Sequence, residues 1–214
     1  HDAELGAAAP AGVGVEGVVV GAVDDDALQV DVAAEDFDAV VSRVVNLDVV
    51  DGRARTDARQ GQALQLNGAG TRYKAVFKVY TAGLYLEKPA RSLQEIAALP
   101  GPKRISVTML RDIDSAELGK LFSRGMEDNM ERAAFSKLIP GVMRMSEIFT
   151  QHKKLLAGES FMVDWLPGQG AIVTVKGQPQ GEAFKEPEFF NALLGIWLGP
   201  HPADDQLKKA LLGG

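Results

Sequence analysis

Two parts of the chain differ in their pattern of hydrophobic and polar positions. In residues 1–60, short clusters of Val and Ala are interrupted by acidic residues, and neither a period of about 3.6 nor a period of about 2 is sustained. From about Gln62 onward, strand and helix patterns become clear. We therefore predict an acidic, weakly ordered Val/Ala/Asp/Gly-rich segment over residues 1–60 and one folded domain over residues 61–214.

Strands are predicted first in this domain. Residues 63–70, ALQLNGAG, indicate a strand that runs into a glycine turn. Residues 73–80 follow with strict alternation, which is typical of a strand. One face would carry Tyr73, Ala75, Phe77 and Val79, and the other Lys74, Val76, Lys78 and Tyr80. Residues 103–110 predict another strand, and residues 159–184 predict a meander with turns at Pro167-Gly168 and Gly177.

Helices are predicted between and after these strands. Residues 92–99 indicate a short helix that Pro100 stops, and Asp114 with Glu117 forms a capping box for the next helix. The apolar stripe of that helix consists of Leu118, Leu121, Phe122, Gly125 and Met126. Pro140 and Gly141 are expected to separate it from a second helix, with the stripe Met145, Ile148, Phe149, His152 and Leu156. Pro187 begins a further helix, and residues 203–214 end the chain with a short one.

The order of the elements predicts the fold class. Strands, helices, strands and helices follow one another, which favours an α+β fold with helices packed on one face of a large antiparallel sheet. Such an arrangement can leave a crevice between the two layers, a usual place for a small ligand.

Composition and charge exclude several classes of function. The chain has no cysteine, which rules out disulfides, thiol nucleophiles and thiolate metal sites. No apolar run reaches the ~18 residues of a membrane span. Residues 1–60 contain four Arg, ten Asp and three Glu, a net charge of −9, against −6 for the whole chain. The remaining +3 over residues 61–214 is too weak to indicate a nucleic-acid partner.

Few side chains suggest catalysis or metal binding. The three histidines, His1, His152 and His201, have no paired spacing, so we expect neither a zinc site nor another cofactor. We expect His152 to be a structural residue at the boundary of the core. The sequence GAGTR at residues 68–72 is neither a phosphate loop nor a dinucleotide fingerprint, so turn glycines explain it. No pair of carboxylates stands out for acid–base chemistry.

Arg72 and Tyr80 remain as candidates because both fall on the even-numbered face of the predicted strand. A guanidinium group binds a carboxylate or polarises a carbonyl through parallel N–H bonds, and a nearby hydroxyl adds a further bond. The alternative is a solvated strand face, for which Lys74 and Lys78 are the evidence. Spacing alone favours the solvated face.

A family resemblance changes this balance. Residues 68–87, GAGTRYKAVFKVYTAGLYLE, resemble the chalcone isomerase superfamily, in which a Gly-x-Gly-x-Arg motif precedes a strand ending in Gly-Leu-Tyr-Leu. Residues 189–214 are similar to the closing helices of the family, and residues 103–129 to its central strand and helix. The resemblance covers residues 62–213 and looks closest to the bacterial chalcone isomerase-like proteins. It implies an open-faced β-sandwich, with helices on one side of a large antiparallel sheet.

The superfamily has two functional branches, one of enzymes that cyclise chalcones and one of proteins that bind fatty acids. In both, the arginine of the glycine motif anchors the ligand, which corresponds to Arg72. The next anchor is a threonine in the enzymes and a tyrosine in the binders, and Tyr80 falls at that position. The tyrosine and asparagine that the enzymes carry early in the central helix are missing from RDIDSAELGKLFSRG, and Asn129 lies too far along to replace them.

The resemblance therefore predicts a non-catalytic protein that binds a fatty acid or a similar elongated apolar carboxylate. Arg72 and Tyr80 would hold the carboxylate, and the pocket lining would consist of Phe77, Val107, Met109, Phe122, Met126 and Phe149. The alternative is an intramolecular lyase or isomerase acting on a chalcone-like enone. Relatives of this type are often exported or periplasmic, although residues 6–23 contain Glu16 and do not match a signal peptide. The sequence does not indicate the oligomeric state.

Overall fold

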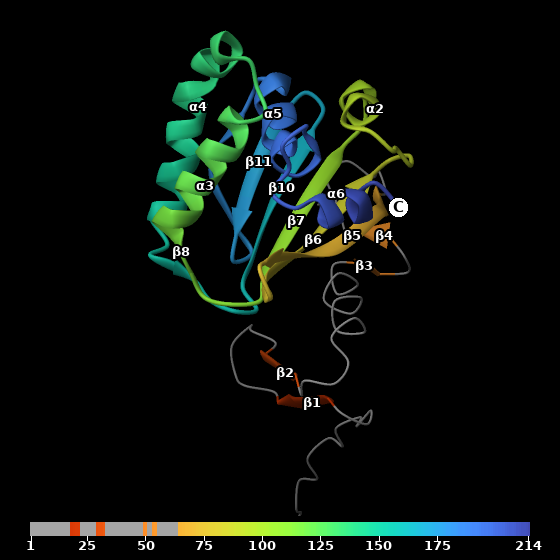
Figure 1. The fold of residues 1–214 in the computed structure, drawn as a ribbon, viewed down its shortest axis with the longest axis vertical. Coiled ribbons are helices and arrows are strands. Elements are labelled where there is room, and N and C mark those ends of the chain that lie inside the picture. The colour runs from red at the N-terminus through yellow and green to blue at the C-terminus, as the bar shows by residue number, and fades with distance from the viewer. Residues whose placement is uncertain (1–17, 22–28, 33–48, 51–52, 55–63) are drawn as a thin grey trace, which may run out of the picture. The chain divides into compact units, whose positions relative to one another are not determined.

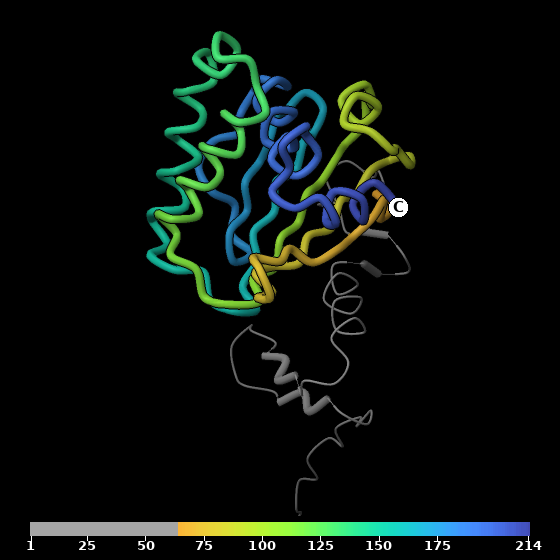
Figure 2. Tube along the Cα trace, viewed as in Figure 1, coloured from red at the N-terminus to blue at the C-terminus, as the bar shows by residue number. Residues whose placement is uncertain are grey.

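The computed structural model describes residues 64–214 in full and the backbone of four short strands before them (Figures 1 and 2). The chain forms two compact units, His1–Val40 and Val41–Gly214. In the first unit, β1 (Val18–Gly21) pairs antiparallel with β2 (Gln29–Val32). The weak order predicted for residues 1–60 concerns positions that lie mostly outside the described residues. The second unit begins before residue 61, because its sheet already includes β3 (Val49–Val50) and β4 (Arg53–Ala54).

The second unit is built on one antiparallel sheet of eight strands in the order β12-β11-β10-β7-β6-β5-β4-β3. Its six longer strands are β5 (Leu64–Lys74), β6 (Phe77–Leu86), β7 (Lys103–Met109), β10 (Ser160–Leu166), β11 (Gly170–Val175) and β12 (Gln178–Phe184). The helices pack against this sheet (Figure 1). The predicted α+β fold with a large antiparallel sheet and packed helices is confirmed, and so are the strand at residues 103–110 and the meander.

The prediction of a single strand over residues 73–80 is wrong. The chain turns at Ala75 and Val76, so residues 73–74 end β5 and residues 77–80 begin β6. Ala75 adopts a left-handed conformation with φ of 54°, which glycine or asparagine usually takes. Because the turn lacks those residues and contains only two positions, the alternation of polar and apolar side chains runs through it without a visible break.

Five helices lie in the described part of the second unit: α2 (Leu93–Ala98), α3 (Ser115–Glu127), α4 (Arg132–Thr150), α5 (Pro187–Leu198) and α6 (Asp205–Leu211). The carboxylate of Asp114 accepts hydrogen bonds from the N–H groups of Ala116 and Glu117, which confirms the predicted helix start. A small sheet of β8 (Ile113–Asp114) and β9 (Lys154–Leu155) joins the beginning of α3 to the chain after α4.

The predicted helix break at Pro140 and Gly141 is also wrong. Both residues lie inside α4, and the break between α3 and α4 falls at residues 128–131. Gly141 serves packing instead, because a Cβ atom there would lie 2.8 Å from the ring of Phe189 on α5. As α4 ends at Thr150, His152 and Leu156 lie beyond the helix and outside its apolar stripe.

The hydrophobic core fills the layer between the sheet and the helices. It includes Ile105 and Val107 of β7, Phe161 and Val163 of β10, and nearly the whole of α5. Burial on almost every side explains why FFNALLGIWL in α5 has only one polar residue, Asn191. The helix-facing side of β5 and β6 closes this layer, and the candidate site lies there.

Candidate functional site

Arg72 and Tyr80 lie opposite each other on neighbouring strands. They are cross-strand partners of β5 and β6, and the Cζ atom of Arg72 lies 5.6 Å from the centre of the Tyr80 ring. The register shifts directly after this pair, because Tyr73 pairs with Lys78 and leaves Val79 as an extra residue in a β-bulge. The sequence placed the two residues on one face of a continuous strand, whereas in the structure the hairpin makes them neighbours.

The glycine motif lets α6 lie directly on β5. A Cβ atom at Gly68 would overlap the carbonyl oxygen of Ala210, and one at Gly70 would lie 2.8 Å from the Cβ of Ala210. These glycines are therefore not turn residues, as the sequence suggested, but positions of close approach within a strand. The third residue of the motif, Arg72, follows on the same side of β5.

The hydroxyl group of Tyr80 is held by a tryptophan from the far end of the chain. The Nε1–H of Trp197 donates a hydrogen bond of 2.8 Å to the Tyr80 oxygen, and both side chains are buried. Burial raises the pKa of Tyr80 above its usual value of 10.0, although the charge of Arg72 and the bond from Trp197 oppose this rise. The hydroxyl therefore stays protonated at physiological pH.

The guanidinium group of Arg72 is only partly engaged by the described residues. Its Nε atom is buried without a hydrogen-bond partner there. Asp204, the N-cap of α6, contributes to the electrostatic surroundings of Tyr80 but uses its carboxylate elsewhere. One oxygen accepts from the N–H groups of Gln206 and Leu207, and the other accepts from the N–H of Tyr73 at 3.0 Å.

The site thus presents hydrogen-bond donors. An indole N–H only donates, so the Tyr80 oxygen is the acceptor in its bond with Trp197, and the Tyr80 proton is left to donate elsewhere. A guanidinium group likewise only donates and carries a permanent positive charge. A neutral phenol beside a charged guanidinium suits an anionic acceptor, such as a carboxylate.

The residues expected to line a pocket fall into two groups. Five are buried in the layer between the sheet and the helices: Val107, Met109, Phe122, Met126 and Phe149. Met109 is the cross-strand partner of Tyr80, and the Phe122 ring lies 6.0 Å from that of Trp197, so this group adjoins the site. Phe77 does not belong to it, because it lies on the hairpin and is 60% exposed.

Sequence reasoning missed Trp197 and Asp204. Trp197 is 117 residues from Tyr80 along the chain, and its side chain reads as one of several apolar residues of α5. The only available signal was that a buried indole usually requires an acceptor for its N–H group. Asp204 was visible as an acidic residue near a helix start, but nothing in the sequence linked it to Tyr80.

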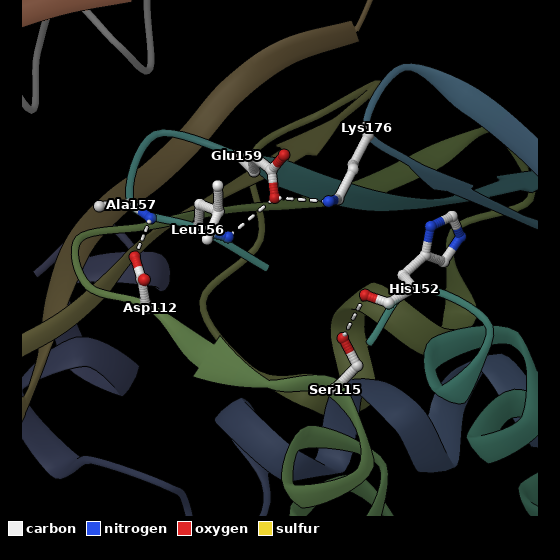
Figure 3. A network of polar contacts seen from close by, with 7 residues as sticks. All are labelled: Asp112, Ser115, His152, Leu156, Ala157, Glu159 and Lys176. Carbon is white, nitrogen blue, oxygen red and sulfur yellow. Dashed lines mark hydrogen bonds and ion pairs between the residues drawn. The ribbon is translucent and has the colours of Figure 1, made fainter. Parts of the chain in front are cut away.

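Two other polar residues have structural roles. The Asn129 amide donates to the carbonyls of Gly125 and His201 and accepts from the N–H of His201, so it joins the end of α3 to the loop after α5. The half-buried His152 ring contacts the Gln180 side chain at 3.1 Å, while its carbonyl accepts from Ser115 (Figure 3). Among residues 64–214 no cluster of three or more His, Asp or Glu side chains is arranged to hold a metal.

No helix in the described part of the chain has the length and apolar character required to cross a bilayer.

Comparison with known proteins identifies the family and the fold. The model of a family described as chalcone isomerase-like matches residues 48–213, and the match begins upstream of the residue 62 at which the sequence resemblance starts. A solved structure of an Arabidopsis thaliana fatty-acid binding protein shares the fold, with a TM-score of 0.55 and 16% identity over 77% of this chain and 88% of the other. No curated protein matches the sequence. The family match extends over most of the chain, and the protein therefore belongs to the chalcone isomerase-like family.

Proposed function

We propose that the protein binds a fatty acid or a similar elongated apolar carboxylate, with Arg72 and Tyr80 holding the carboxylate. The observation that carries this proposal is the pairing of two donors, the Arg72 guanidinium and the Tyr80 hydroxyl, at the boundary of an apolar layer. The fold shared with a fatty-acid binding protein supports the same class of ligand.

The acyl chain would extend from this pair into the layer between the sheet and the helices. Met109, Phe122 and Trp197 surround the Tyr80 side of that layer and offer apolar contacts. Each buried CH₂ group contributes about 0.8 kcal/mol, so a long chain supplies most of the affinity. A hydrogen bond to a charged group adds about 1.5–3 kcal/mol and selects the acid over an alcohol or hydrocarbon of equal length.

Native mass spectrometry of the purified protein tests the proposal. The wild type should retain a fatty acid, identified by extraction, or bind one that is added, whereas Arg72→Gln and Tyr80→Phe should lose it in part or in full. Arg124→Gln is the matched control, because the side chain of Arg124 is 81% exposed on α3. It removes the same charge away from the site and should leave binding unchanged.

A fatty alcohol of the same chain length provides the second comparison. If Arg72 binds a carboxylate, the alcohol binds more weakly to the wild type, and Arg72→Gln removes most of that difference. Equal binding of acid and alcohol, or equal acid binding by wild type and Arg72→Gln, would refute the proposed site.

A further inference from the structure

The β5–β6 turn lies at one end of the sheet together with the loops after β7 and β9 (Figure 1). Exposed apolar side chains gather at this end. Val76 and Phe77 at the turn are 82% and 60% exposed, and Leu156 and Tyr73 are 46% and 40% exposed. Four of the eight exposed large apolar residues in the described part of the chain therefore lie at this end of the sheet. We call Tyr73, Lys74, Val76, Phe77, Arg111 and Leu156 the tip surface.

Backbone hydrogen bonds hold the three segments of this end together. The N–H of Leu110 donates to the carbonyl of Val79, and the N–H of Gly158 donates to the carbonyl of Met109. Arg111 in the loop after β7 lies over the Phe77 ring, with its Cζ atom 5.6 Å from the ring centre. The tip surface is therefore one continuous feature of the fold rather than a set of separate loops.

The charge around these apolar residues is positive. Lys74 and Arg111 are exposed beside the turn, and Lys153, Lys154 and Lys176 are exposed on neighbouring segments. This differs from the whole chain, which carries −6.

Acidic residues at this end form hydrogen bonds or an ion pair within the protein (Figure 3). Asp112 accepts from the N–H of Ala157, and Asp114 caps α3. Glu159 accepts from the N–H of Leu156 and pairs with Lys176 at 2.8 Å. Hydrogen bonding leaves these carboxylates charged, and Glu159 offsets the charge of Lys176. Lys74 and Arg111, beside the turn, form no ion pair with the described residues and supply the positive charge of the tip surface.

We propose that the tip surface docks on the surface of an anionic lipid bilayer. Val76 and Phe77 would enter the interfacial layer, while Lys74 and Arg111 would contact the lipid phosphates. A turn that projects apolar side chains between cations matches the two parts of such a surface, apolar below and negatively charged above. A second copy of the chain would bury these side chains in a complementary groove, and this is a separate outcome of the test below.

The position of Arg72 fits this orientation. Two residues of extended strand, about 7 Å at about 3.3 Å per residue, lead from Arg72 to Lys74, where the turn at Ala75 and Val76 begins. Docking would therefore bring Arg72 close to the headgroup layer, where the carboxylate of a membrane-borne fatty acid lies. The docking inference does not depend on the proposed ligand, because it rests on the tip surface and not on the carboxylate site.

Vesicle sedimentation of the full chain measures docking. Vesicles of phosphatidylcholine mixed equally with phosphatidylglycerol should bind the protein, and vesicles of phosphatidylcholine alone should bind it weakly. Lys74→Gln with Arg111→Gln should lower the affinity by roughly thirtyfold at low salt, because each cation near an anionic surface contributes a factor of about five. Lys120→Gln with Lys137→Gln, at exposed positions of α3 and α4, is the charge-matched control and should retain binding.

A second pair of variants tests the apolar part. Val76→Ser with Phe77→Ser should abolish most binding, whereas Ile139→Ser with Met143→Ser removes comparably exposed apolar side chains from α4 and should not. The fluorescence emission of the Phe77→Trp variant, after subtraction of the wild-type spectrum, should shift to the blue on adding the anionic vesicles and be quenched by brominated lipid. Melting temperatures should stay near that of the wild type, since the substituted side chains are exposed.

Three results would overturn the proposal. The first is the absence of binding to anionic vesicles. The second is binding that the Val76 and Phe77 substitutions leave unchanged, or an emission of the Phe77→Trp variant that does not respond to lipid. The third is a dimer, seen by sedimentation equilibrium, that the serine substitutions convert to a monomer, because a second copy of the chain would then be the occupant of the tip surface.

Discussion

Replacing Tyr80 with Phe removes only the hydroxyl oxygen that joins Tyr80 to Trp197 in the candidate site. The ring keeps its packing, but the Trp197 N–H loses its acceptor at 2.8 Å in a buried position. An unsatisfied buried donor costs about 1–3 kcal/mol. For a unit of this size, 1 kcal/mol corresponds to about 2–4 °C in melting temperature, so we expect a decrease of roughly 2–12 °C.

The pH dependence of this effect follows from the pKa of Tyr80. Burial raises that pKa in the folded protein above 10.0, so the native state holds the phenol proton more tightly than the unfolded state. The corresponding stability is fully present below pH 10 and is lost as the pH rises above it. The difference in unfolding free energy between wild type and Tyr80→Phe should therefore narrow above pH 10.

Urea unfolding at pH 7 and at increasing pH above 10 measures both effects. Tyr73→Phe is the control, because Tyr73 is 40% exposed and its substitution should change stability by less than about 0.5 kcal/mol. If Tyr80→Phe is as stable as the wild type at pH 7, the buried bond to Trp197 does not exist in solution and the site described above is wrong.

Two further predictions concern the scaffold. Arg104→Ala should destabilise the protein by about 3–5 kcal/mol and leave fatty-acid binding intact, because it removes the bidentate partner of Asp164, whose side chain is only 14% exposed. Thermal unfolding and ligand titration of one sample check this, and loss of binding in the folded variant would contradict it. Gly68→Ala should lower stability by about 1–3 kcal/mol, because its Cβ would overlap the backbone of α6. Gly195→Ala in α5 should be tolerated, because its Cβ would lie 3.5 Å from the nearest atom, and equal unfolding curves for the two variants would contradict the close approach of α6 to β5.

Local signals in the sequence predicted most helix starts and the antiparallel meander. Asp114 caps α3 and Pro187 begins α5 as expected, because an N-cap or a first-turn proline acts on its own neighbours. The same local logic failed at Pro140, where the glycine that follows meets the Phe189 ring of another helix. A contact between distant elements leaves no mark in the local pattern.

The candidate site was partly predictable for the same reason. The family resemblance pointed to Arg72 and Tyr80, while alternation alone favoured a solvated strand face. Periodicity did not reveal the hairpin that makes them partners, because its turn contains Ala75 and Val76 rather than the usual glycine or asparagine. Trp197, which positions the Tyr80 hydroxyl, is visible only once α5 is folded onto the sheet.

Carbon-13 NMR tests the central claim most directly, on a bound fatty acid that is enriched in carbon-13 at its carboxyl carbon. If Arg72 holds the acid, the chemical shift of this carbon should stay at the value of the ionised carboxylate at pH values where the free acid is already protonated, because the neighbouring positive charge lowers the pKa of the bound acid. Arg72→Gln should return the titration toward that of the free acid. A bound acid that titrates identically in both proteins would contradict the account.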